Sequence, residues 1–261
     1  MKVENKNGFY VTLPSNASLH VYPNNKIWSF RTKLAKPIVL DEPYEVGLIE
    51  FQYPRVWTSF PASDADVTIF DSKTQQTLTI QLSVGFYDSV PRIVKEFNSK
   101  CLLHQPTSRI SMQYNNITNF IYFSGAEGSI LTFKGRLAEI LGFKPGVPFA
   151  LPPSLNFRKH YVAPYPADIY GGIHNIFVYS DIVDYQLVGD SHVPLLRCIN
   201  ITPDVGRMPT LMYDKPNYTS LSKSAFDDIE ISLKNDQNQY MPFMYGKVIV
   251  KLHFRPVKQY F

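Results

Sequence analysis

The side chains best suited to catalysis or metal binding are scattered along this sequence. The chain has six histidines and two cysteines. No two histidines stand three or four residues apart, and the histidines and cysteines do not combine into the spacing of a zinc site. They are His20, His104, His160, His174, His192 and His253, with Cys101 and Cys198. The sequence therefore predicts neither a metal site nor a cofactor.

Two groups of acidic residues are dense enough to be weighed as sites. They are Asp181, Asp184 and Asp190 in one group, and Asp227, Asp228 and Glu230 in the other. The first group falls at or between predicted strand ends, where carboxylates usually face solvent, and the second lacks the loop spacing of a calcium site. Nucleophile-elbow, Walker and dinucleotide-binding glycine motifs are absent. We expect no enzyme, with a hydrolase of unrecognised site as an open alternative.

Two stretches interleave aromatic and basic side chains, Asn156–Tyr161 (NFRKHY) and Arg255–Phe261 (RPVKQYF). Such a pattern can form a stacking platform for nucleic acid. The basic residues are few, however, and the net charge of the chain is only +4. An interface or a loose tail explains these stretches better, and no specific nucleic-acid partner is expected.

The composition favours an assembly over a free monomer. Aromatic residues make up 14% of the chain and charged residues only 18%. Cys101 falls on a predicted apolar helix face and Cys198 in a predicted strand, so both are expected to be buried free thiols. No hydrophobic segment follows Met1, and no run approaches the ~18 apolar residues of a membrane helix. We expect no signal peptide and no membrane partner.

The C-terminal region predicts two amphipathic strands. Ile229, Ile231 and Leu233 alternate with polar side chains, and Val248, Val250, Leu252 and Phe254 repeat the pattern. Successive side chains of a strand point to opposite faces, so each run has one apolar face and one wet face. Ile249 is the apolar exception on the wet face. These strands predict an antiparallel sheet that covers a core on one side.

Further strand patterns near the N-terminus and after residue 173 supply partners for this sheet. The middle of the chain differs, because a helical stripe at 90–101 and a short helix at 136–141 stand among short strands. We predict a mainly β fold: a single jelly-roll β-sandwich made of 1–63 and 150–261, with a small α+β subdomain, 64–149, inserted in a loop.

Five stretches in chain order resemble one known family. They are FYVTLPSNAS (9–18), YEVGLIEFQYP (44–54), RLAEILGF (136–143), HNIFVYSDIVDYQLVGDSHVPLLRCI (174–199) and GKVIVKLHF (246–254). Together they resemble the minor capsid, or penton, protein of Maverick/Polinton elements and related adintoviruses, similar in role to the adenovirus penton base. The resemblance implies a single jelly roll, homopentamers at the vertices of an icosahedral capsid, and a double jelly-roll major capsid protein as partner. It implies no catalytic residue.

Irregular segments rich in aromatic residues are the natural candidates for such an interface, because obligate interfaces are enriched in these side chains. The candidates are Trp57, Phe60, Tyr165, Tyr170, Tyr240, Phe243, Tyr245 and the exceptional Ile249. The alternative from another class is a non-enzymatic β-sandwich binding module for carbohydrate or a host protein, including one domesticated from a mobile element.

Overall fold

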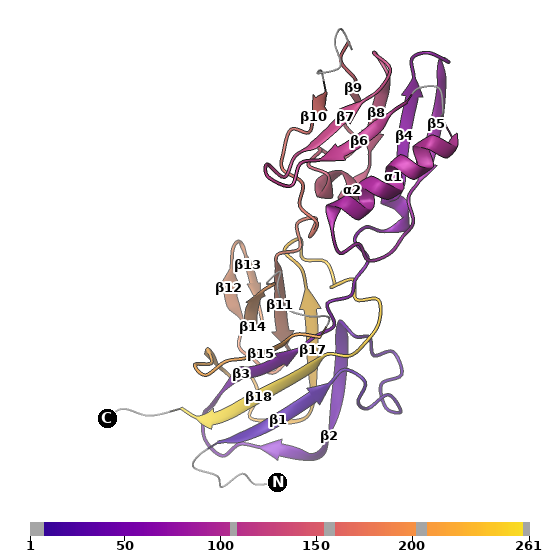
Figure 1. The fold of residues 1–261 in the computed structure, drawn as a ribbon. Helices are drawn as coiled ribbons and strands as arrows, with labels where there is room; N and C mark the ends of the chain where they lie inside the picture. Colours follow the sequence, from indigo (N-terminus) through magenta and orange to yellow (C-terminus); the bar gives the residue numbers. More distant parts are fainter. Residues whose placement is uncertain (1–7, 105–108, 154–159, 202–207, 258–261) are drawn as a thin grey trace. The chain divides into compact units, whose positions relative to one another are not determined.

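The computed structural model of the chain describes residues 8–104, 109–153, 160–201 and 208–257. The chain divides into two compact units (Figure 1). The first, which we call the sandwich unit, comprises 1–57 and 173–261, and the second, the inserted unit, comprises 58–172. The predicted insert at 64–149 lies within the second unit. That either unit folds alone stays a prediction.

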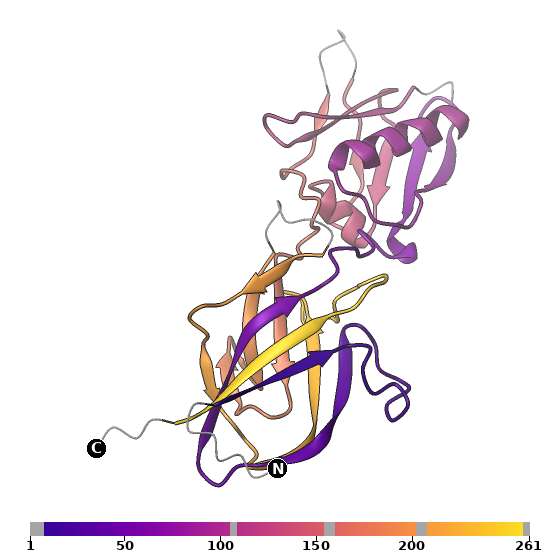
Figure 2. The same ribbon diagram turned by 60° about the horizontal axis from the view of Figure 1, so that its bottom comes forward.

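The sandwich unit consists of two antiparallel sheets (Figures 1 and 2). One has the strand order β1-β18-β3-β15, with β16 also pairing with β3, and the other has the order β14-β11-β17-β2. These strands are β1 (Phe9–Pro14), β2 (Ser29–Val39), β3 (Tyr44–Gln52), β11 (Asn175–Ser180), β14 (Leu195–Asn200), β15 (Thr210–Met212), β16 (Tyr218–Ser220), β17 (Ala225–Lys234) and β18 (Ile249–Pro256). A separate hairpin of β12 (Gln186–Val188) and β13 (Ser191–Val193) joins β11 to β14.

The connectivity is that of a jelly roll. The first strand pairs with the last, Phe9 opposite Phe254, and β1, β2 and β3 pass alternately from one sheet to the other. Strand neighbours that are distant in sequence are typical of two-sheet jelly rolls. The predicted fold class, a jelly-roll β-sandwich with an inserted α+β subdomain, is confirmed.

The core lies between the two sheets, on the faces that alternation predicted. Ile229, Ile231 and Leu233 of β17 are fully buried, as are Val248, Val250, Leu252 and Phe254 around β18. The rings of Phe226 and Phe254, from opposite sheets, stack with centroids 6.0 Å apart. Apolar side chains from both sheets therefore meet in one layer, as in other aligned sandwiches.

The inserted unit combines two small sheets with helices (Figure 1). The sheet orders are β5-β4-β8-β9 and β10-β7-β6. Its elements are a 3-10 turn at Ala62–Asp64, β4 (Asp66–Asp71), β5 (Gln76–Gln81), α1 (Val90–His104), β6 (Ser111–Tyr114), β7 (Ile121–Ser124), β8 (Ile130–Phe133), α2 (Gly135–Ile140), β9 (Phe149–Ala150) and β10 (Tyr161–Val162). The predicted helical stripe is correct, since Val90, Ile93, Phe97 and Cys101 of α1 are buried.

Gly142 directly follows the C-cap of α2, Leu141. Its φ is +81°, and a Cβ there would lie 2.0 Å from the carbonyl oxygen of Tyr165. The Phe143 N–H returns to the carbonyl of Ala138 at 2.8 Å. A left-handed residue followed by this hydrogen bond is a common helix C-cap, and only glycine leaves room here for the neighbouring chain.

Several short strands escaped the sequence patterns. β9 lies in a proline-rich stretch, β10 in a stretch without clear periodicity, and β15 and β16 in a segment with three prolines. Each has only two or three residues, too few to show alternation. Pro194 separates β13 from β14, because proline cannot donate a ladder hydrogen bond.

Candidate interface surfaces

The acidic residues weighed as sites are held in polar contacts or exposed on the sandwich unit. Asp181 accepts a hydrogen bond from the Glu230 N–H at 2.8 Å and pairs with Lys223 at 3.0 Å. Asp184 and Asp190 are exposed. Within the described residues, no group of three or more His, Cys, Asp or Glu side chains could hold a metal. The expectation of no metal site stays a prediction.

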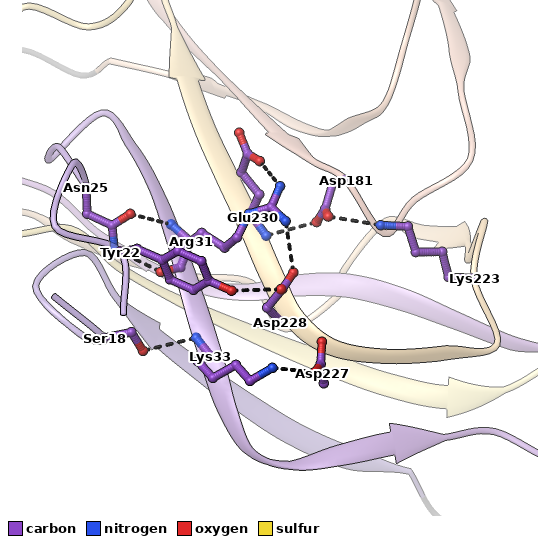
Figure 3. A network of polar contacts seen from close by, with 10 residues as sticks. All are labelled: Ser18, Tyr22, Asn25, Arg31, Lys33, Asp181, Lys223, Asp227, Asp228 and Glu230. Carbon is purple, nitrogen blue, oxygen red and sulfur yellow. Dashed lines mark hydrogen bonds and ion pairs between the residues drawn. The ribbon is translucent and has the colours of Figure 1, made fainter. Parts of the chain in front are cut away.

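The second acidic group forms the polar network in Figure 3. Arg31 of β2 pairs with Glu230 and, at 3.2 Å, with Asp228, while Lys33 pairs with Asp227. The hydrogen bond to Asp227, the largest cause, raises the pKa of Lys33, and the same contact lowers that of Asp227. Cross-strand pairs of opposite charge stabilise β2 against β17 on the outer face of their sheet.

The same network holds down the connection between β1 and β2, which we call the 15–28 loop. The Ser18 Oγ accepts the Lys33 N–H at 3.0 Å, and the Tyr22 hydroxyl donates to Asp228 at 2.8 Å (Figure 3). Asn25 accepts the Arg31 N–H at 2.9 Å and donates to its carbonyl at 2.8 Å. A hollow of about 350 Å³ lies between this loop and the sheet, lined in part by Val21, Tyr22, Pro23, Phe30 and Arg31.

The outer face of the other sheet carries a second ordered layer. Lys251 of β18 pairs with Glu50 of β3 at 3.6 Å, and Arg255 pairs with Glu45 at 2.6 Å. The Arg255 guanidinium also lies 3.4 Å from the centroid of the Tyr218 ring. The wet face of β18 is thus covered by paired side chains of this chain itself.

His253 belongs to this layer and does not form part of a metal site. Its ring stacks on Tyr10 with centroids 4.7 Å apart, and its Nδ1 lies 2.8 Å from the Tyr218 hydroxyl. Gly47 lies opposite both His253 and Tyr218 in the ladder. A Cβ on Gly47 would lie 2.9 Å from the Cβ of Pro216, so glycine is what allows the 216–218 segment to approach β3.

The β12–β13 connection forms an exposed hairpin, which we call the 184–193 hairpin. Leu187 is 82% exposed and Tyr185 is 59% exposed, with the Tyr185 ring 5.4 Å from that of His192. The Gln186 amide donates to the Leu195 carbonyl at 2.7 Å and to the Thr219 hydroxyl at 3.1 Å, which fixes the base of the hairpin. Gly189 and Asp190 form the turn between β12 and β13.

The residues predicted for an interface divide by exposure. Trp57, Phe60 and Phe243 are almost fully buried, so little of their surface is accessible in this conformation. Trp57 and Phe243 form a bridge between their backbones, and their rings lie 6.4 Å apart. The accessible or partly accessible members are Tyr165, Tyr170, Tyr240, Tyr245 and Ile249. Their role at an interface stays a prediction.

The two cysteines differ in environment. Cys101 is buried, and burial raises the pKa of its thiol to about 12. Cys198 is exposed, and the expectation that it is buried is wrong. It lies on the edge strand β14, opposite Phe177, on the face turned away from the core. Partial burial, and then the Asp236 charge, raise the pKa of the Cys198 thiol.

The basic and aromatic stretches lie partly outside the described residues. Of Asn156–Tyr161, only residues 160 and 161 are described, and His160 packs edge-on against Tyr122 at 6.4 Å. Of Arg255–Phe261, residues 258–261 lie outside the description. The expectation of no specific nucleic-acid partner stays a prediction. None of the described helices combines the length and apolar character needed to span a membrane.

The 15–28 loop and the 184–193 hairpin were not among the predicted interface residues. The prediction favoured aromatic residues in irregular segments, whereas the hairpin has regular strands. The sequence did contain a signal for the hairpin, because Tyr185 and Leu187 alternate with other residues and so lie on one side of the two-stranded ribbon. Both side chains are exposed. The loop gave no such signal. Its Tyr22 hydroxyl bonds Asp228, 206 positions away, and its Ser18 and Asn25 side chains bond backbone atoms of β2.

Comparison with solved structures finds a similar fold in a viral protein. The mavirus penton protein aligns with a TM-score of 0.54 and 14% identity, over 95% of this chain and 99% of the penton chain. A chain of the Sputnik virophage, solved by cryo-EM, aligns with a TM-score of 0.48 and 10% identity, over 96% of this chain and 98% of that chain. No protein-family model and no curated protein matches the sequence. At 14% identity, the likeness to the mavirus protein shows a shared fold.

Proposed function

We propose that the chain is a structural minor capsid protein of the penton type, without enzymatic activity or cofactor. In this proposal, identical copies form homopentamers at the vertices of an icosahedral particle. The major capsid protein, a double jelly roll, surrounds them. The source is a mobile element or virus of the Maverick/Polinton and adintovirus kind.

One observation supports the proposal most. The jelly roll with its insert between β3 and β11 aligns over almost the whole length of a protein whose name describes it as a penton. The alignment includes both units, so it extends beyond the sandwich that many unrelated proteins share. The resemblance of five sequence stretches to penton proteins is a separate line of support.

The accessible residues of the predicted interface give a direct mutational test. Ile249 is a partly exposed apolar side chain on the wet face of β18, next to the Lys251–Glu50 pair. If a neighbouring copy or the inserted unit covers this face, we expect Ile249→Asp to prevent pentamers, or to undock the inserted unit, while the sandwich stays folded. Normal assembly of this variant, with the insert in place, would mean that Ile249 is simply exposed to solvent.

Sedimentation velocity of the purified protein across a concentration series tests the proposal as a whole. We expect a discrete oligomer of five chains, and incorporation into particles when a double jelly-roll major capsid protein is co-expressed. A protein that stays monomeric at high concentration and never enters particles would contradict the capsid role. It would favour the binding module for carbohydrate or a host protein.

A further inference from the structure

We propose that neighbouring copies of this chain meet through the 184–193 hairpin of one copy and the 15–28 loop of the next. This inference rests on the proposed ring of identical subunits. A cyclic ring uses heterologous contacts, in which each subunit offers two different patches on different sides. The sandwich unit has two such patches, and they differ in shape: one projects and the other is hollowed.

The two patches lie on opposite sides of the sandwich unit (Figures 1 and 2). The loop leads into β2, one edge of the sheet β14-β11-β17-β2, and the hairpin leads into β14, the other edge. The hairpin and the loop also connect to the sheet at the same end of its strands. Ser180 of β11, Ile231 of β17 and Phe30 of β2 are register partners across the sheet, so the two connections lie at one level. Rotation around a ring involves no rise, so patches at one level on opposite sides can meet.

The exposed apolar side chains of both patches suit such a contact. Leu187 and Tyr185 project from the hairpin with 82% and 59% of their surface exposed. On the loop, Leu19 and Val21 are 48% and 44% exposed, and Val21 borders the hollow of about 350 Å³. Groups of exposed apolar side chains with polar surroundings are a mark of protein–protein interaction sites.

The charges of the two patches are opposite. The hairpin carries Asp184 and Asp190 and has no lysine or arginine, whereas the loop carries Lys26 and has no acidic residue. All three charged side chains are exposed. The Glu230 carboxylate also lines the hollow, but it is paired with Arg31. Complementary charge at a contact sets its register and disfavours the pairing of hairpin with hairpin. It therefore selects a head-to-tail arrangement over a twofold dimer.

Both patches are ordered before any partner arrives. Tyr22 and Asn25 tie the loop to β17 and β2 (Figure 3), and Gln186 ties the hairpin to neighbouring strands. A contact between pre-ordered surfaces loses less conformational entropy on association than one between mobile loops. The polar network on β2 and β17 thus has a consequence for assembly, since it holds the receiving loop in place.

Thiol cross-linking of the full chain tests the contact. Leu187→Cys and Val21→Cys are combined in a Cys198→Ser background, which leaves the buried Cys101 as the native thiol. After treatment with a short bismaleimide, a denaturing gel should show a ladder that ends at the number of chains in the ring. Variants with only one of the two new cysteines should remain single chains.

A paired substitution supplies the second arm. We expect Leu187→Asp to raise the dissociation constant of the oligomer at least tenfold. Val39→Asp, at an exposed apolar side chain at the far end of β2, should leave it unchanged. Rings that form in sedimentation but give no ladder, or that tolerate Leu187→Asp, would overturn this contact and leave the capsid role standing. A chain that stays monomeric in every variant would overturn both.

Discussion

Removal of one buried side chain from the closing strand gives the sharpest test of the sandwich. Leu252 is fully buried, and β18 pairs it with Val11 of β1 on one side and Leu48 of β3 on the other. Truncation of a buried leucine to alanine costs ~2–5 kcal/mol, from lost burial and from the cavity that remains. A domain has only ~5–15 kcal/mol of stability in total. At about 3 °C per kcal/mol for a domain of this size, Leu252→Ala should lower the unfolding midpoint by roughly 6–15 °C.

Tryptophan fluorescence reports on the sandwich unit selectively. The chain has two tryptophans, Trp28 and Trp57, and both belong to that unit. Thermal unfolding followed by their emission therefore separates the sandwich from the inserted unit. Lys251→Ala is the matched control on the neighbouring position, where the half-exposed ammonium pairs with Glu50 at 3.6 Å. It should change stability by under ~0.5 kcal/mol, as is usual for surface substitutions. Equal losses at the two positions would refute the assignment of inner and outer faces.

Three further outcomes follow from the two units and their ionisable groups. Replacement of residues 58–172 by a flexible linker should leave the tryptophan emission and the β signal in circular dichroism of the sandwich intact; cooperative loss of both would contradict the two-unit interpretation. Burial raises the pKa of Glu96, but hydrogen bonds, the strongest of them from Tyr87, outweigh burial and lower this pKa from 4.5 to about 2. The contribution of Glu96 to stability is therefore complete above about pH 4.5 and is lost as the pH falls towards 2. Hydrogen exchange of α1, corrected for intrinsic rates, should show this loss, and Glu96→Gln should abolish it. With a thiol reagent, native protein should titrate Cys198 alone, faster as the pH rises, and Cys101 only after unfolding.

Sequence patterns predicted the parts of the fold in which one periodicity extends over a whole element. Alternation along β18 and the helical stripe of α1 each involve several buried side chains, so one misplaced residue does not hide the pattern. β15 and β16 have three residues each, and their pairing with β3 depends on the tertiary fold. No local pattern encodes such pairing.

The interface role of the candidate residues stays a prediction, but the sequence did not indicate which of them would be buried, for a related reason. Trp57 and Phe243 occur in irregular, proline-containing segments, and nothing in their neighbourhoods indicates that they pack together across 186 positions of the chain. Arg197 is a charged residue whose inward position the sequence did not indicate. It lies beside Val178, where alternation would predict an apolar residue. Its guanidinium lies 3.5 Å from the centroid of the Tyr213 ring, which makes this position tolerable for a charge.

The charges on the sandwich unit constrain where another chain can bind. Ion pairs occupy the outer face of each sheet, Arg255–Glu45 on one and Lys33–Asp227 on the other. A partner that covered either face would remove paired charges from water, and that desolvation offsets much of the gain from contact. The 15–28 loop and the 184–193 hairpin present exposed apolar side chains, with charges of opposite sign on the two patches. Burial of these patches against each other removes apolar surface from water and pairs Lys26 with an acidic neighbour, so the sides of the sandwich are better suited to assembly than its faces.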